Sequence, residues 1–367
     1  MKYHYFLLIF FIFFYVGCAD EGPEDLKGDL EDIAYAPTSY TYKNPPGYPK
    51  MEFPANNAPT AEGIDLGRRL FYDPILSRDS SMGCFSCHKQ EFAFTDGGAT
   101  SIGVDGKFGT RSSMSIVDVG YNYKGLFWDG RAANLEDQAL LPVEDPVELH
   151  SSWPEVEVKL RRSKFYPELF RKAFGIKDKK EITKALAAKA IAQFERTIVT
   201  SGKSKYDQFV YQGIGFLTNE ESDGLDMFFD KAIGVLPDAQ CGHCHNDPMF
   251  STNDFFDNGI SGISDPNMFI DKGKGGFTKN VVDIGKFRAP SLRNIMLTAP
   301  YMHDGSLKTI EDVLEHYTVG GKPSGRRDPL ISQIHVSQEQ KDQLLAFLKT
   351  LSDPEIVKDT TFSNPFK

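Results

Sequence analysis

The feature that most constrains this chain is a cysteine pentad that occurs twice, as Cys-Phe-Ser-Cys-His at residues 84–88 and as Cys-Gly-His-Cys-His at residues 241–245. Two thiols separated by two residues and followed at once by a histidine form the attachment signature of a c-type haem. The thiols add to the vinyl groups of the porphyrin, and the histidine becomes the proximal ligand of the iron. The fold must therefore hold two flat cofactors, each beside its own pentad.

The chain has five cysteines, and the two pentads use four of them. Zinc binding would need further Cys or His ligands beside each pair, and a redox Cys-x-x-Cys would not need the adjacent histidine twice. We therefore predict two covalently bound c-type haems. Their binding residues are Cys84, Cys87 and His88 for the first, and Cys241, Cys244 and His245 for the second.

The N-terminus has the character of a targeting segment. Lys2 precedes the apolar run FLLIFFIFFYVG, which is too short to span a bilayer comfortably and ends at Gly17-Cys18. This pattern resembles a bacterial lipoprotein signal, although Tyr15 stands where leucine is usual. We expect cleavage after the signal, lipidation of Cys18, and a periplasmic protein held to a membrane by its lipid. An ordinary secretory signal is the alternative.

Composition narrows the class of protein. A net charge of -10 over 367 residues argues against a nucleic-acid partner, which would require a basic surface. Residues 19–52 are rich in Asp, Glu, Pro and Tyr without an apolar period, and we interpret them as a flexible tether. Helical periodicity marks residues 182–201, and capping boxes open the helices predicted over 218–232 and 337–351. No segment alternates with a period of two, so the predicted class is all-α.

An internal repeat divides the body of the chain. FWDGRAANLEDQALLP follows the first pentad, and YMHDGSLKTIEDVLEHY follows the second, with Asp-Gly and Glu-Asp at matching positions. We predict two tandem cytochrome c-like domains, each with one haem. Their bounds are 53–205 and 206–352, after a signal peptide at 1–18 and the tether at 19–52, and before a C-terminal tail at 353–367.

The repeat also predicts that the two haems differ. The same offset from Asp-Gly falls on Pro142 in the first domain and on Tyr317 in the second. Proline cannot ligate iron, whereas Tyr317 can do so as a phenolate, and Met302 and His316 are rival ligands. A first iron with an open sixth position suits a reaction at the iron, and a second iron with all six positions filled suits electron storage.

Over residues 55–350, the chain resembles the bacterial di-haem cytochrome c peroxidase and MauG family. The resemblance rests on the two pentads together with the segments LFWDGRAANLEDQALLPVEDPVEL and FRAPSLRNIMLTAPYMHDGSLKTIEDVLEHY. The resemblance implies that the first haem reduces hydrogen peroxide and the second relays electrons. It implies that Trp128 lies between the haems, that Gln138 and Glu148 line the peroxide pocket, and that Thr298 and Pro300 help to hold a calcium ion.

Three departures from the family pattern bear on function. Residues 89–149 lack the histidine that blocks the first haem of many family members, so we expect that haem to be open. Tyr317 replaces their methionine, as in the MauG branch. In the family pattern, the asparagine of an Arg-Asn pair contributes to calcium binding. In this chain, the pair is Arg111-Ser112, so serine stands in place of that asparagine.

The expected function is an exported peroxidase that takes electrons from a small donor protein such as a cytochrome c, and the family also allows a homodimer. A MauG-like enzyme that oxidises residues of a partner protein is the first alternative. A non-enzymatic electron-transfer cytochrome is the second.

Overall fold

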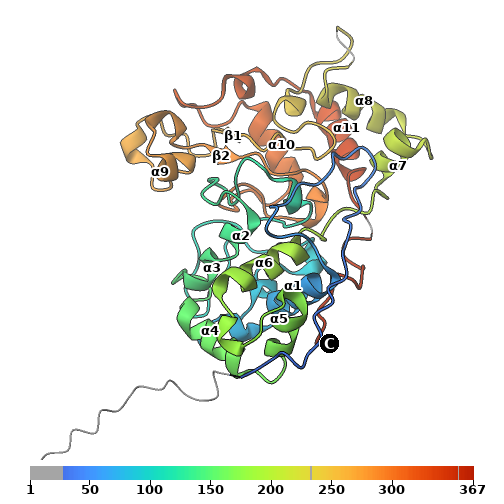
Figure 1. Cartoon of the computed structure of the whole chain (residues 1–367). Helices are drawn as coiled ribbons and strands as arrows, with labels where there is room; N and C mark the ends of the chain where they lie inside the picture. Colours follow the sequence, from blue (N-terminus) through green and yellow to red (C-terminus); the bar gives the residue numbers. More distant parts are fainter. Residues whose placement is uncertain (1–27, 232–233, 354) are drawn as a thin grey trace, which may run out of the picture.

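The computed structural model describes residues 28–231, 234–353 and 355–367, and in it the helices form two groups (Figure 1). The helices of the first group are α1 (Ala61–Tyr72), α2 (Leu135–Gln138), α3 (Leu141–Glu144), α4 (Trp153–Arg162), α5 (Tyr166–Phe174) and α6 (Lys184–Glu195). Those of the second group are α7 (Lys205–Gln212), α8 (Asn219–Phe228), α9 (Lys274–Thr278), α10 (Ile310–Thr318) and α11 (Gln338–Lys349). Long loops join them, and β1 (Phe255–Phe256) pairs antiparallel with β2 (Phe287–Arg288).

The helices that the sequence predicted are present, with the expected caps. In α8, the side chain of Thr218 accepts from the backbone of Glu221, and Glu221 in return accepts from the backbone of Thr218. Ser337 and Gln340 make the same reciprocal contacts at the start of α11. The helix expected over 182–201 is shorter, because α6 ends at Glu195 and the following residues form turns.

Each group contains one close helix pair built around a glycine. Gly67 of α1 lies against the backbone of Ala190 in α6, and Gly224 of α8 lies against the backbone of Gln343 in α11. Any side chain at either glycine would collide with the facing helix, so glycine allows the two axes to approach closely. The separate apolar cores include Leu66, Leu70, Trp153, Phe170 and Ile191 in the first group, and Phe228, Phe250, Leu344, Phe347 and Leu351 in the second.

The two copies of the internal repeat adopt the same backbone corner. Phe127 and Met302 occupy equivalent places and both have positive φ angles, 64° and 73°. Each corner is closed by one antiparallel bridge, from Leu126 to Ala132 and from Tyr301 to Leu307. The repeat therefore places Trp128 and His303 at matching positions in the two halves. The division of the chain at residue 205 stays a prediction.

The predicted flexible tether is wrong for residues 28–52, which lie along the body of the protein. Leu30, Tyr48 and Met51 are buried, and the backbone N–H of Leu30 donates to the carbonyl of Lys177 at 2.8 Å. Tyr42 donates its hydroxyl to the carbonyl of Gln193 at 3.0 Å. Isolated aromatic anchors hold this segment, and they leave no periodic pattern in the sequence. We call residues 28–52 the N-terminal strap.

The C-terminal tail, residues 353–367, returns to the first helix group. Phe362 is buried beside Phe94, and Phe94 follows His88 by six residues. Tyr72 of α1 donates its hydroxyl to the carbonyl of Phe362 at 2.6 Å. Gln90 donates to the carbonyls of Ile356 and Asp359 at 3.1 and 2.8 Å. The end of the chain therefore completes the core beside the first pentad.

The proposed signal peptide and Cys18 lie outside the described residues. Within the described part of the chain, no helix has both the length and the apolar character needed to cross a membrane.

Candidate functional site

The first pentad forms a short 3₁₀ turn, Cys84–Ser86, that brings the following histidine back over the two cysteines. The backbone N–H of His88 donates to the carbonyl of Cys84 at 3.0 Å. The His88 Nδ1 atom lies 2.9 Å from the carbonyl oxygen of Phe94. That contact assigns the proton to Nδ1 and leaves Nε2 with a lone pair for a metal. Burial lowers the pKa of His88, which favours the neutral, ligating form.

The second pentad repeats this arrangement with the turn Cys241–His243. The backbone N–H of His245 donates to the carbonyl of Cys241 at 2.9 Å. Its Nδ1 lies 3.1 Å from the carbonyl oxygen of Phe250 and 3.0 Å from that of Pro290. Burial lowers the pKa of His245 as well. Both histidines are therefore oriented by backbone carbonyls and have Nε2 available for an axial bond to iron.

The four pentad cysteines are free thiols in the structure. Burial raises the pKa of Cys84 above its usual range and that of Cys241 to about 12, so these thiols are poor nucleophiles at neutral pH. Among the described residues, no group of three or more Cys, His, Asp or Glu side chains could hold a metal ion. The high thiol pKa values disfavour the thiol-redox interpretation and the lack of further ligands among the described residues disfavours zinc, which leaves the haem interpretation.

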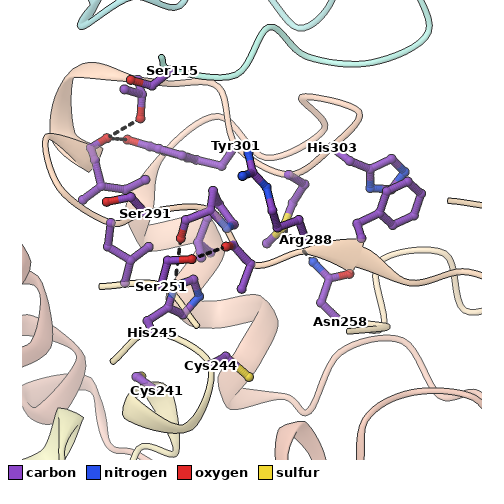
Figure 2. A pocket seen from close by; sticks show the side chains of 18 of the residues that line it. Ser115, Cys241, Cys244, His245, Ser251, Asn258, Arg288, Ser291, Tyr301 and His303 are labelled. Atoms are coloured by element: carbon purple, nitrogen blue, oxygen red, sulfur yellow. Dashed lines mark hydrogen bonds between the residues drawn. The ribbon is translucent and has the colours of Figure 1, made fainter. Parts of the chain in front are cut away.

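A large, mainly apolar cavity lies in front of the second pentad, with Cys241, Cys244 and His245 on one wall (Figure 2). Tyr317, on α10, lines the same cavity. Burial raises the pKa of the Tyr317 hydroxyl, and a contact with Asn258 opposes this effect. The hydroxyl is thus neutral without a cation, and a ferric iron would be needed to hold it as a phenolate.

The two rival ligands are placed differently. His316 points its Nε2 at the backbone carbonyl of Asn258, 2.9 Å away, and is not among the residues that line the cavity. Met302 does line it, but its sulfur accepts a hydrogen bond from the side chain of Asn258 at 3.1 Å. Tyr317 and Met302 thus both line the cavity and both contact the side chain of Asn258, and the ligation of iron by Tyr317 stays a prediction.

Arg288 supplies a strong indication that the cavity receives an anionic cofactor. This residue of β2 is 5% exposed and projects into the cavity (Figure 2), yet its Nε and Nη1 atoms have no hydrogen-bond partner in the described structure. Its Nη2 reaches only the sulfur of Met114, at 3.5 Å. Burial without a carboxylate lowers the pKa of Arg288 to about 10. An unpaired buried charge is costly, and a haem propionate is an anion suited to pair with it.

Trp128 links the two halves of the site. Its indole N–H donates to the carbonyl of Ser112 at 2.8 Å, and its own carbonyl accepts from the backbone N–H of Arg288 at 2.9 Å. Ser113, which follows Ser112 in the chain, donates its hydroxyl to the carbonyl of Cys87 at 2.6 Å. Trp128 lines the cavity of the second pentad. Trp128 thus lies in the cavity of the second pentad and is hydrogen-bonded to the segment that contacts the first pentad.

Glu148 is a partly buried carboxyl group near the first pentad. Burial and the neighbouring Asp145 raise its pKa to about 7, while Arg131 opposes the shift. Its charge in turn contributes to the raised pKa values of Cys84 and Cys87. A carboxyl group with this pKa can accept and return a proton at neutral pH.

Gln138 is the last residue of α2 and is partly exposed. Its backbone N–H donates to the carbonyl of Asn134 at 3.0 Å. No hydrogen bond of its side-chain amide occurs with other described residues, so the amide is free to bind a ligand. Whether it shares a pocket with Glu148 stays a prediction from the resemblance.

The predicted calcium donors are uncharged in this structure. The hydroxyl of Thr298 donates to the carbonyl of Ile295 at 3.2 Å, and Pro300 offers only its carbonyl. Ser112 uses its backbone N–H to bind the carbonyl of His303 at 2.7 Å. Calcium prefers several oxygen ligands that include carboxylates. These residues alone fit calcium poorly, and the ion stays an expectation of the resemblance.

Arg288 is the main site residue that sequence reasoning did not single out, although it stands in the quoted segment FRAPSLRN. One arginine within an apolar loop was the available signal. Its lack of a carboxylate partner could be seen only in the folded chain.

Comparison with known proteins gives consistent results. A family model described as di-haem cytochrome c peroxidase matches residues 61–214. Cytochrome-c peroxidase IdrP1 of Pseudomonas sp. strain SCT is 31% identical, over 87% of this chain and 89% of that protein. Methylamine utilization protein MauG of Methylorubrum extorquens is 32% identical, over 81% of this chain and 80% of that protein.

Solved structures agree with these matches. A MauG-like protein associated with microbial copper homeostasis superposes with a TM-score of 0.80 at 34% identity, over 90% of this chain and all of that one. The di-haem peroxidase BthA of Burkholderia thailandensis superposes with a TM-score of 0.66 at 21% identity, which supports the fold alone.

Proposed function

The chain belongs to the di-haem cytochrome c peroxidase and MauG family, and from this premise we propose that it reduces hydrogen peroxide to water. The reaction consumes one peroxide, two electrons and two protons and yields two waters. The electrons come one at a time from a small periplasmic donor such as a cytochrome c. Two covalent haems are held by the pentads, with His88 and His245 as proximal ligands and Tyr317 as the sixth ligand of the second iron.

The observation that carries this proposal is the raised pKa of Glu148, about 7, beside the first pentad. A bound haem supplies an iron centre that exchanges single electrons and reduces peroxide. The carboxylate of Glu148 accepts a proton from one peroxide oxygen and returns it to the other, which leaves as water. An ordinary surface carboxylate would be too weak a base for this shuttle.

Two further side chains support the reaction. The free amide of Gln138 holds peroxide by a hydrogen bond without changing charge. Trp128 provides an oxidisable ring on the wall of the cavity of the second pentad, and the hydrogen bond from its indole N–H to the carbonyl of Ser112 orients the ring. Through it, electrons stored at the second site reach the first.

Export and attachment to a membrane are part of the proposal. Covalent c-type haem and the N-terminal sequence pattern both favour a periplasmic protein, lipidated at Cys18. Leu30, in the N-terminal strap, is buried in the body of the protein and follows the proposed lipid-bearing Cys18 by 12 positions. A homodimer is compatible with this arrangement.

A MauG-like function is the second candidate, and Tyr317 is the observation that favours it. An anionic oxygen ligand stabilises highly oxidised iron, which suits slow oxidation of residues in a partner protein more than rapid turnover. The solved MauG-like protein with 34% identity also supports this alternative.

The test is an EPR spectrum of the oxidised protein before and after peroxide, followed by turnover with a reduced cytochrome c. One high-spin haem that peroxide consumes, with rapid turnover, supports the peroxidase. The same spectra with slow turnover and a persistent oxidised state support the MauG-like enzyme. Two low-spin haems whose spectra do not change with peroxide would contradict both the peroxidase and the MauG-like function and would indicate an electron-transfer cytochrome.

A further inference from the structure

A buried tyrosine lies between the cavity of the second pentad and an open surface pocket. Tyr48, on the N-terminal strap, is 8% exposed and lines the surface pocket together with Tyr123 and Lys124. On its inner side, Asp118 and Arg293 line the large cavity that also contains His245. Met249, which packs in the same buried cluster as Tyr48, lines both the surface pocket and the large cavity. Tyr48 therefore lies between the cofactor site and the exterior.

The contacts of Tyr48 lead directly to the proximal side of the second site. Its ring centroid lies 5.1 Å from the guanidinium carbon of Arg293, and that carbon lies 5.4 Å from the ring centroid of Phe250. The carbonyl of Phe250 in turn accepts from Nδ1 of His245. Arg293 and Phe250 therefore form a continuous path of packed residues from Tyr48 to His245.

A proton acceptor for Tyr48 is already in place. The Tyr48 hydroxyl donates to Oδ2 of Asp118 at 2.9 Å, and Oδ1 of Asp118 accepts from the backbone N–H of Thr200 at 2.9 Å. Both residues are buried, at 8% and 3% exposure. Removal of an electron from a phenol makes its O–H strongly acidic, so a carboxylate in hydrogen-bond contact lets the proton leave in the same event.

The surrounding charges leave the carboxylate usable for this purpose. Burial raises the pKa of Asp118 to about 6, Arg293 and the hydroxyl of Tyr48 lower it, and Asp207 raises it. Arg293 is itself paired with Asp207 by two hydrogen bonds of 2.9 Å, so its charge is largely compensated. Asp118 is therefore ionised at neutral pH and still basic enough to accept a proton.

From this geometry we propose that Tyr48 is a redox-active relay, with Asp118 as its proton acceptor, through which oxidising equivalents pass from the second site to reductants at the surface pocket. This proposal rests on the proposed function, because hydrogen peroxide acting at the haems is the oxidant. The Tyr48 phenol gives one electron to the oxidised haem pair and its proton to Asp118, which leaves a neutral phenoxyl radical. A one-electron reductant at the pocket then reduces the radical, and Asp118 returns the proton.

The relay would serve either of the two candidate enzymes. In a peroxidase, it is the route by which donor electrons enter the second site. In a MauG-like enzyme, it carries oxidation outward to a residue of a partner protein. A purely structural role for Tyr48, as an anchor of the N-terminal strap, would need the ring and the hydrogen bond but no radical.

Tyr121 offers a matched control. Its ring packs edge-on against Tyr48, with centroids 4.9 Å apart, and it is 3% exposed. Its hydroxyl donates to the side-chain oxygen of Asn44 at 3.1 Å instead of to a carboxylate. Tyr121→Phe therefore removes a buried hydroxyl of the same region without removing the proposed proton acceptor pair.

The experiment mixes the haem-loaded protein with hydrogen peroxide in the absence of reductant, then freezes samples for EPR while absorption spectra follow the haems. We expect a tyrosyl radical, identified by the narrowing of its signal when the protein contains deuterated tyrosine. The signal should disappear in Tyr48→Phe, persist in Tyr121→Phe, and weaken in Asp118→Asn. In the unmodified protein it should grow as the pH rises through about 6, where Asp118 ionises.

Two results would overturn the relay while sparing the proposed function. One is normal oxidation of the haems without a tyrosyl radical, and the other is an undiminished radical in Tyr48→Phe. Haem spectra that do not respond to peroxide would refute the proposed function itself, and the relay with it. Unchanged haem absorption in each resting variant shows that the substitution has not disturbed folding.

Discussion

Substitution of Glu148 by glutamine tests the acid–base chemistry of the first site most directly. Glutamine keeps the shape and the hydrogen bonds of the side chain but cannot take up a proton. Loss of a positioned general base slows proton transfer by about a hundredfold to ten-thousandfold. We expect a decrease in that range for the rate at which peroxide oxidises the haems, with little change in the spectrum of the resting protein.

The pH dependence of the rate at which peroxide oxidises the haems gives a more specific prediction. With a pKa of about 7, Glu148 is ionised in about 1% of molecules at pH 5, whereas its ordinary value of 4.5 would leave about three quarters ionised. The carboxylate is the reactive form, so the rate should fall as the pH decreases below 7, by about a hundredfold at pH 5. In Glu148→Gln, this dependence should vanish.

The assay is stopped-flow absorption of the haems after mixing with peroxide, from pH 5 to pH 8. Glu144→Gln is the matched control, because Glu144 is an exposed carboxylate at the end of α3, four residues away. An inflection near pH 4.5, or a Glu148→Gln variant that retains the full rate, would refute the assignment of Glu148 as the base.

Three other substitutions, and Lys124→Gln as a control, test the second site and the body of the protein. Tyr317→Met should raise the reduction potential of the second haem, since a neutral thioether stabilises ferric iron less than a phenolate does; a redox titration that shows no shift would argue against ligation by Tyr317. Arg288→Met should lower the same potential, because it removes a buried positive charge from the cavity wall; an unchanged potential would mean that the guanidinium does not face the cofactor. Asp207→Asn should cost about 3 to 5 kcal/mol in the free energy of unfolding, as its side chain and that of Arg293 are each 1% exposed and paired. Lys124→Gln, which breaks an exposed pair, should cost less than about 1 kcal/mol in the same denaturation experiment, and equal losses would contradict the assigned burial.

Sequence reasoning found the parts of the site that are encoded locally. A pentad fixes its own turn, so the orientation of His88 and His245 toward two cysteines follows from five residues. The matching offsets of the repeat led to Tyr317, and the structure places this residue in the cavity of the second pentad. Glu148 was named by resemblance, and only the packing around it accounts for its raised pKa.

The features that the sequence did not reveal depend on contacts between distant segments. The hydrogen bond from Tyr48 to Asp118 joins residues 70 positions apart, and the one from Tyr72 to Phe362 spans 290 positions. Neither segment has an apolar period, so composition alone suggested a tether and a tail. The lack of a carboxylate partner for Arg288 likewise cannot be read from the sequence, because it depends on which side chains the fold places around the guanidinium.

The course of the C-terminal tail has a consequence for the order of events during biosynthesis. The tail packs on the loop after the first pentad, and Phe362 is made long after Cys84 and Cys87. As the chain emerges, the first two thiols are therefore available before the segment that closes their surroundings exists. Attachment of the first haem can therefore take place before residues 353–367 have been made, and these residues then close over the finished site.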